Sequence, residues 1–360
     1  MQPAAARPTF ARLASQAGIF LLCVLSSMAA RPQAPGEAVA LRIVGGLAGV
    51  NQFTRHEEPF WTRDLPRLTG GRVTAQVVPF DRAGLRGQEM LSLMRSGAVP
   101  FGTALLALGS PRDLELNAPD LAGLNPDMPT LRRNVALFRP TLEALLRERG
   151  IEPLALYTYP AQVLFCRRAI SGLASLKGLR VRTSSPSQSD WVEALGGQAV
   201  TTPFADILHH LRAGNIDCAI TGTMSGNTIG LHELTTHLYT QPVTWGLSMF
   251  GANAAAWRAL PEDLRTLLRR ELARLETEIW AESERETGSG IECNTGAPTC
   301  RGGQPGRMTL VPPVAADDQR RREIFASLVL PRWLQRCGPG CAPLWNRTLG
   351  AGNGVRAPER

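Results

Sequence analysis

The chain contains 360 residues, of which 44% are hydrophobic and 19% are charged. This is the composition of a folded protein of about two domains, and it excludes a largely disordered chain. The formal net charge is +8, and Arg residues supply almost all of the positive charge. The main basic run, at 320–322, lies beside acidic residues, and no basic stripe interleaved with aromatic residues occurs, so we expect no nucleic-acid partner.

The first thirty residues have the pattern of a secretory signal peptide. Arg7 and Arg12 precede an apolar run at 17–25, and candidate cleavage sites of small residues follow at 27–29 and 38–40. The run is too short to span a bilayer. We therefore expect residues 1–30 to be removed on export and the mature protein to be periplasmic. An uncleaved N-terminal anchor is the alternative.

From residue 40 to about 160, strand-like and helix-like segments alternate. A first strand at 40–46 ends in two glycines, and a helix follows in which Thr54 and Glu57 have the spacing of a capping box. A strand at 72–78, a helix around 88–96 and an apolar run at 101–109 come next. An amphipathic helix is expected at 131–149, with Pro140 as a kink or break.

The same alternation continues in the second half of the chain. The predicted strands there are 151–160, 162–168, one ending near residue 182, 198–203 and 216–222. Short helices are expected at 188–197 and 204–215, and the longest helix runs from Pro261 to about Glu286. Alternating strands and helices are typical of βαβ units with mostly parallel sheets.

Six cysteines follow Cys23, and four of them form two close pairs in Gly- and Pro-rich surroundings near the C-terminus. These four are Cys293, Cys300, Cys337 and Cys341. In an exported protein such pairs favour disulfides over a zinc site, and the sequence leaves all three pairings open. Cys166 and Cys218 lie in apolar, strand-like runs and are predicted to be buried free thiols.

The sequence contains none of the common catalytic constellations. No G-x-S-x-G elbow or phosphate-binding Gly loop occurs, and the five histidines lack the spacing of a metal site. We therefore predict no catalytic residue, no metal and no cofactor, and an enzyme is the less favoured class.

The stretch "SLKGLRVRTSSPSQSDWVEALGGQAVTTPFADILHHLRAGNIDCAITG" carries an ordered set of features. These are L-K-G-L, an Arg two residues after a hydrophobic position, a helix, a Gly, P-F-x-D, a second helix and an Asp before a strand of small residues. Together with "LTGGRVTAQVVPF", "GQEMLSLMRSG" and "WGLSMFGANAAAWRALPEDLRTLL", this set resembles TRAP transporter solute-binding proteins of the DctP type. The resemblance covers roughly residues 41–287.

The resemblance implies an α/β fold of two doubly wound lobes, with a ligand cleft between them and a long bridging helix. Lobe I would comprise 41–158 and 247–287, including that helix. Lobe II would comprise 159–246 and 288–350, including the tail with its paired cysteines.

The resemblance also implies a set of ligand contacts in lobe II. Arg182 corresponds to the Arg that clamps a ligand carboxylate in the family, and its planar fork suits a bidentate pair. Phe204 corresponds to the aromatic residue beside that Arg. Thr221 and the backbone N–H of Gly222 are expected to donate hydrogen bonds to the same carboxylate.

Three further positions are candidate ligand contacts: Gln162, Trp245 and Asn51. Gln162 stands where some members carry a second Arg. Because an amide is neutral, we expect a monocarboxylate with a neutral or apolar remainder.

The resemblance implies an exported binding protein that captures a small organic acid and delivers it to TRAP membrane subunits. We expect it to be a monomer. A periplasmic ligand sensor on the same scaffold is the main alternative. A secreted enzyme and a structural or adhesive protein are the remaining ones.

Overall fold

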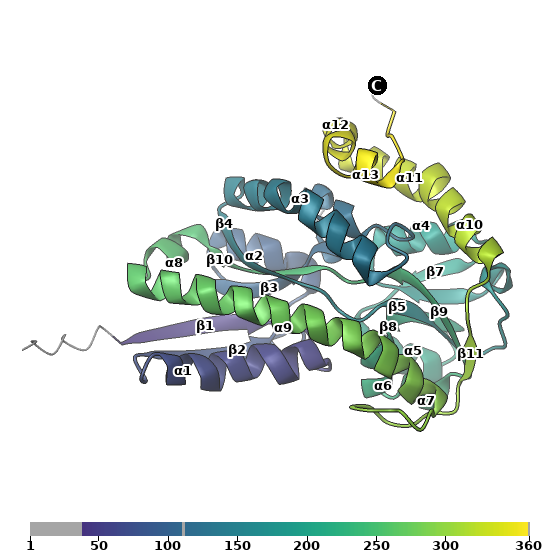
Figure 1. The fold of residues 1–360 in the computed structure, drawn as a ribbon, viewed down its shortest axis with the longest axis horizontal. Coiled ribbons are helices and arrows are strands. Elements are labelled where there is room, and N and C mark those ends of the chain that lie inside the picture. Colours follow the sequence, from purple (N-terminus) through teal and green to yellow (C-terminus); the bar gives the residue numbers. More distant parts are fainter. Residues whose placement is uncertain (1–37, 110–111, 359–360) are drawn as a thin grey trace, which may run out of the picture. The chain divides into compact units, whose positions relative to one another are not determined.

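The strands of the computed structural model, which describes residues 38–109 and 112–358, form two separate sheets (Figure 1). The first has the order β2-β1-β3-β10-β4 and the second β11-β9-β5-β8-β6-β7. The first-sheet strands are β1 (Val39–Gly45), β2 (Val73–Pro79), β3 (Phe101–Leu105), β4 (Ile151–Tyr157) and β10 (Ser248–Asn253). The second-sheet strands are β5 (Gln162–Cys166), β6 (Arg180–Thr183), β7 (Gln198–Thr201), β8 (Cys218–Gly222), β9 (His237–Thr244) and β11 (Thr309–Val311).

Helices connect and cover both sheets, as predicted for two α/β lobes joined by a long helix. In chain order they are α1 (Leu65–Leu68), α2 (Met90–Ser96), α3 (Met128–Glu148), α4 (Pro186–Ala194), α5 (Ile207–Arg212), α6 (Thr223–Thr228), α7 (Leu231–Leu234), α8 (Ala254–Arg258), α9 (Glu262–Thr295), α10 (Ala315–Ile324), α11 (Leu330–Cys337), α12 (Cys341–Trp345) and α13 (Ala351–Asn353). Below, the first lobe means the first sheet with its connections, and the second lobe means the second sheet with its connections. The predicted signal peptide, residues 1–30, lies outside the described residues.

Both sheets are mixed, whereas the sequence pattern predicted mostly parallel ones. In the first sheet β10 is antiparallel to β3 and β4, and in the second sheet β5 is antiparallel to β8 and β9. Each of these two strands comes directly after the chain has crossed from the other lobe. The strand therefore enters its sheet from the edge that faces the partner lobe, opposite to the βαβ direction.

The long helix α9 runs along both lobes (Figure 1). Its apolar stripe, which includes Leu264, Leu268 and Leu272, is buried in the same cluster as first-sheet residues. The helix continues past the predicted end at Glu286 to Thr295, and Gly290 packs directly on α6. A Cβ atom at Gly290 would lie 2.4 Å from the backbone nitrogen of Met224, so only glycine permits this approach.

Two other local predictions differ from the structure. Helix α3 continues through Pro140, which is exposed. The first helical run begins at Gln52, upstream of the predicted capping box at Thr54 and Glu57. Glu57 is instead fully buried, and its Oε2 accepts hydrogen bonds from the Gly46 N–H at 3.0 Å and the Thr103 hydroxyl at 2.9 Å.

Three disulfides are present in the described part of the chain. Cys293 pairs with Cys300, and Cys337 pairs with Cys341, so each candidate is bonded to its neighbour in sequence. The prediction of free thiols at Cys166 and Cys218 is wrong, because these two residues are bonded to each other. They are directly opposite on the antiparallel strands β5 and β8, with Cα atoms 4.1 Å apart, a pairing that their separation of 52 residues hides in the sequence.

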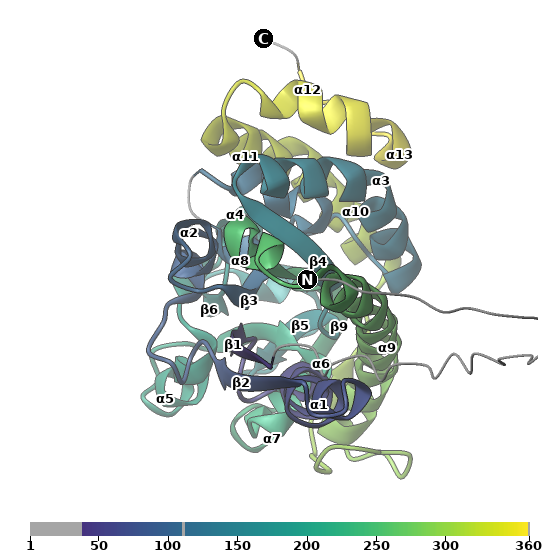
Figure 2. The same cartoon turned by 90° about the vertical axis from the view of Figure 1, so that its left-hand side faces the viewer.

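The C-terminal helices lie beside α3 (Figure 2) and connect the two lobes. The indole nitrogen of Trp333 on α11 donates to the carbonyl oxygen of Leu114 at 3.0 Å, on the first-lobe side. Arg332 on the same helix forms an ion pair of 3.2 Å with Asp190 on α4, in the second lobe. The tail therefore holds elements of both lobes together.

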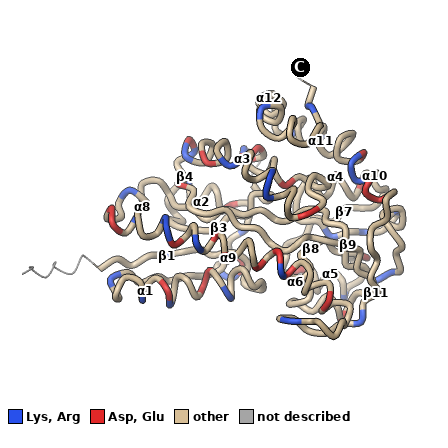
Figure 3. Tube along the Cα trace, viewed as in Figure 1, with Lys and Arg blue, Asp and Glu red and all other residues tan. Residues whose placement is uncertain are grey.

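Acidic and basic residues are interleaved along the surface helices (Figure 3). On α10, Arg320 pairs with Glu323 at 3.4 Å and Arg321 with Asp318 at 2.8 Å, so the basic run of the sequence is ion-paired. Within 38–109 and 112–358, no helix is both long enough and apolar enough to cross a membrane.

Candidate functional site

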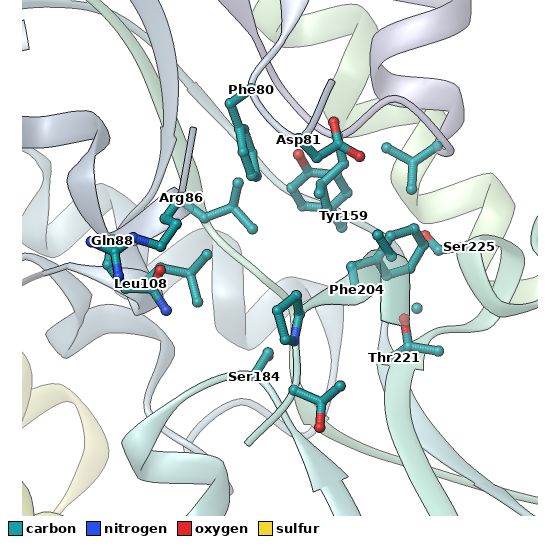
Figure 4. Close-up of a pocket in the computed structure, with 18 of the residues that line it drawn as sticks. Phe80, Asp81, Arg86, Gln88, Leu108, Tyr159, Ser184, Phe204, Thr221 and Ser225 are labelled. Atoms are coloured by element: carbon teal, nitrogen blue, oxygen red, sulfur yellow. The ribbon is translucent and has the colours of Figure 1, made fainter. Parts of the chain in front are cut away.

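A cavity of about 390 Å³ opens between the facing edges of the two sheets (Figure 4). Its first-lobe residues follow the carboxyl ends of β1, β2 and β3, which are parallel to one another. Its second-lobe residues lie at the carboxyl ends of β6, β7 and β8 and at the start of the antiparallel β5. Ligand sites of α/β sheets lie at carboxyl edges of this kind.

Arg182 is the charged residue on the second-lobe side of the cavity. It is only 3% exposed, and its guanidinium donates from Nε to the Thr202 carbonyl at 2.9 Å and from Nη1 to the Ile220 carbonyl at 2.8 Å. Among the described residues it forms no ion pair. Burial lowers the pKa of Arg182 to about 9, so it remains a cation at neutral pH. The two carbonyls orient a buried positive charge for which residues 38–109 and 112–358 supply no counter-ion.

Three other predicted residues line the same cavity beside Arg182: Phe204, Thr221 and Gly222. Phe204 is half-buried, and Thr221 on β8 is buried. A Cβ atom at Gly222 would lie 2.8 Å from the Ser225 hydroxyl oxygen, so a larger residue there would displace the start of α6. Figure 4 shows Thr221 below Phe204, with Ser225 to the side.

Gln162 also lines the cavity, at the start of β5 opposite Gly222. Its Oε1 accepts a hydrogen bond from Nε2 of Gln188 at 3.0 Å, which fixes the amide in one orientation. Gly246 passes close to the amide with φ of +74°, and a Cβ atom there would lie 2.3 Å from Nε2 of Gln162. The second crossing between the lobes therefore requires glycine at the point where it passes Gln162.

The structure places Trp245 and Asn51 outside the lining of the cavity. Trp245 is 2% exposed, and its indole N–H donates to the carbonyl oxygen of Asn125 at 3.0 Å. The hydrogen bond to Asn125 holds the indole in this position, outside the cavity lining. Asn51 donates its side-chain amide to Glu286 on α9. Both side chains are thus used in contacts within the fold.

Asp120 fixes the backbone of this crossing. Its carboxyl group accepts hydrogen bonds from the backbone N–H groups of Trp245, Gly246 and Leu247 at 2.7–3.2 Å. Burial raises the pKa of Asp120 to about 6. The other crossing runs alongside, where the N–H of Tyr159 donates to the Trp245 carbonyl at 3.2 Å.

Sequence reasoning missed the first-lobe wall of the cavity. It is mainly apolar and consists of Leu47, Val50, Phe80, Leu85, Leu105 and Leu108. Its polar members include Asp81, Arg86 and Gln88, and Tyr159 lies at the junction with the second lobe. Their position in the sequence could have predicted them, because most of these residues follow the predicted strands at 40–46 and 72–78 or lie in the apolar run at 101–109.

The two lobes approach each other closely beside the cavity. A Cβ atom at Gly49, in the loop after β1, would lie 3.5 Å from the ring of Phe204 and 3.6 Å from Ile229.

The cavity lining contains no His, Cys or Lys. Elsewhere in the described ranges, no three His, Cys, Asp or Glu side chains gather as a metal site would require.

Comparison with solved structures shows the same fold. An extracytoplasmic solute receptor of Bordetella pertussis that binds pyroglutamic acid matches with a TM-score of 0.74 at 20% identity, over 86% of this chain and 99% of that one. A TRAP periplasmic solute-binding protein of Desulfovibrio salexigens with bound orotic acid matches with a TM-score of 0.74 at 18% identity, over 85% and 96%. One of Rhodoferax ferrireducens with bound malonate gives 0.71 at 18%, over 86% and 96%.

The sequence also matches a family model, described as bacterial extracellular solute-binding protein, family 7, over residues 52–294. This range is more than half of the chain and includes Arg182 and most of the cavity lining. The chain therefore belongs to the DctP family, the TRAP-type extracellular solute-binding proteins of family 7.

Proposed function

We propose that this protein captures a small monocarboxylate outside the cytoplasmic membrane and delivers it to a TRAP-type transporter. The observation that carries the proposal is the buried guanidinium of Arg182 in the cavity, which has no ion pair among the described residues. A ligand carboxylate would supply the missing counter-charge. Hydrogen bonds to charged groups contribute about 1.5–3 kcal/mol each, enough to dominate binding of a small acid.

The neutral groups around Arg182 support a single carboxylate. Thr221 can donate its hydroxyl group, and Gln162 has an amide nitrogen without a hydrogen bond in the described part of the protein. The remaining charged residues of the lining are Asp81, which would repel a second carboxylate, and Arg86, which is exposed and donates from Nε to Glu89 at 3.0 Å. Relatives of this fold bind pyroglutamate, orotate or malonate, so small organic acids are the class to test.

We infer that the protein binds its ligand without chemical change. The lining contains no His, Cys or Lys, and none of its serine hydroxyl groups is hydrogen-bonded to Asp81 in the described part of the chain. Release would follow opening of the lobes about the two crossings and α9, since a ligand held by both walls favours the closed arrangement. We further propose a monomer and a transporter with separate membrane subunits as its partner.

The test is binding of carboxylates to ligand-free protein. The protein is unfolded in denaturant without reductant, refolded, and titrated with pyroglutamate, orotate, malonate and succinate by calorimetry. Arg182→Ala should lose at least about 100-fold in affinity for whichever acid binds. Arg180→Ala is the matched control, because Arg180 is on the same strand but pairs with Asp217 at 3.0 Å outside the cavity.

Failure of every acid to bind, or an unchanged affinity in Arg182→Ala, contradicts the proposal. Export is tested separately by mass spectrometry of the mature protein, which should begin between residues 30 and 41. An intact Met1 on the native protein would contradict cleavage.

A further inference from the structure

We propose that Asp81 sets the specificity of this site. It selects a ligand that carries a hydrogen-bond donor in addition to its carboxylate, and it rejects a ligand with a second carboxylate. The inference rests on the proposed function and deepens it. It follows from the placement of Asp81 in the same cavity as Arg182, but on the wall contributed by the first lobe.

Asp81 is fixed in position by the neighbouring loop. It lies two residues after β2, and its Oδ1 accepts a hydrogen bond from the backbone N–H of Ala48 at 3.1 Å. Its other carboxyl oxygen accepts no hydrogen bond from any residue within 38–109 and 112–358. One oxygen is therefore anchored, and the other is available to a ligand.

Figure 4 shows Asp81 beside Tyr159, away from Thr221 and Ser184. The apolar residues Leu47, Val50 and Phe80 line the same cavity. In such surroundings an acceptor left without a donor is costly, and a second negative charge is more so. A ligand that meets both walls must therefore present a carboxylate to Arg182 and an N–H or O–H group to Asp81.

Asp81 could serve only to hold the loop through the N–H of Ala48. An asparagine would do this equally well, because its amide oxygen can accept the same hydrogen bond. Asp81→Asn thus keeps the structural contact and removes only the charge and one acceptor. The two roles can be separated by ligand preference.

The experiment compares three probes of similar size. Pyroglutamate carries a ring N–H, 5-oxotetrahydrofuran-2-carboxylate has an oxygen in its place, and glutarate has a second carboxylate. The wild-type protein should bind the lactam acid at least about tenfold more tightly than the lactone acid, and glutarate more weakly still. In Asp81→Asn the lactam preference should shrink to about threefold or less, and glutarate binding should strengthen.

Two controls accompany the measurement. Asp206→Asn removes a negative charge next to the lining residue Ala205 without touching the lining itself, and it should keep the wild-type preference. Arg182→Ala should lose all three probes. Ligand-free melting confirms that each variant is folded.

Equal affinity of the wild-type protein for the lactam and lactone acids overturns the inference, as does an unchanged preference in Asp81→Asn. Either result, obtained with binding that still depends on Arg182, leaves the proposed function standing. If the wild-type protein binds neither ring acid, the inference is also overturned, and binding of glutarate through Arg182 would then preserve the transport role alone.

Discussion

The two walls of the cavity are built differently. The second-lobe wall consists largely of strand residues and their direct continuations, with Arg182 fixed by two carbonyls and Gln162 by Gln188. The first-lobe wall consists mainly of loop side chains that follow three parallel strands, and most of them are apolar. We call the second-lobe wall the strand wall and the first-lobe wall the loop wall. Hydrogen bonds hold the charged group of the strand wall in one position, whereas the side chains of the loop wall determine which ligand can bind beside that charge.

The largest effect should come from the strand wall. Arg182→Ala should abolish measurable binding, and Arg182→Lys should lose roughly 10–100-fold because ammonium lacks the planar fork. Ligand-free stability should change by only about 1–2 kcal/mol. Burial lowers the pKa of Arg182 to about 9, and this desolvation cost offsets the two hydrogen bonds to carbonyl groups, which contribute about 1.5–3 kcal/mol each.

Calorimetric affinity and ligand-free melting measure the two sides of this prediction. If Arg182→Ala unfolds the empty protein, the residue is structural, and the difference between the walls disappears.

The disulfide between Cys166 and Cys218 should stabilise the strand wall. It links β5 and β8, which carry Gln162 and Thr221 at their other ends. Replacing both cysteines by alanine should lower the free energy of unfolding by about 2–4 kcal/mol. Urea unfolding of the double variant gives the value. Alkylation of the denatured wild-type protein without reductant should label neither thiol, and labelling would contradict the bond.

The loop wall should respond to pH through Glu57. Burial raises the pKa of Glu57 from 4.5 to about 7, and this side chain holds the loop at Gly46 and the strand at Thr103. Between pH 4.5 and 7 the folded protein keeps a proton that the unfolded chain has released. The free energy of unfolding should therefore fall as pH rises through this window, by up to about 3 kcal/mol from this group.

Denaturant unfolding at pH 4.5, 6 and 7.5 tests this sign. Glu57→Gln should flatten the slope in part, since burial also raises the pKa of Asp120 to about 6 and its contribution remains. An identical slope in wild type and variant would refute the assignment.

The smallest effect should come from a single apolar residue of the loop wall. Leu108 is half-buried and packs against Gly87. A Cβ atom added to Gly87 would lie 2.5 Å from Cδ1 of Leu108. Leu108→Ala should change affinities by roughly 3–10-fold and shift preference toward larger acids, because burial of a few methylene groups contributes about 1 kcal/mol. Titration with acids of increasing size measures the shift, and a loss as large as that of Arg182→Ala would remove the distinction between the walls.

Much of the fold could be predicted from the sequence, because its signals are local. The alternation of strands and helices, the long helix and the position of Arg182 after L-K-G-L all lie within short windows. A strand places every second side chain on one face, and its carboxyl end faces the cleft. The resemblance to the DctP family identified Arg182, Thr221 and Gly222 among these strand residues, and all three line the cavity.

Only the tertiary structure decided the features that depend on distant segments. The register of β5 against β8 joins Cys166 to Cys218. The indole of Trp245 donates to the carbonyl oxygen of Asn125, outside the cavity lining, and Asn51 donates its amide to Glu286 on α9. The loop wall, including Asp81, forms where three loops meet. Hydrophobic periodicity does not predict which loops lie side by side. The ordered motifs that resemble the family identified the charge of the site, and long-range packing determined which residues surround that charge.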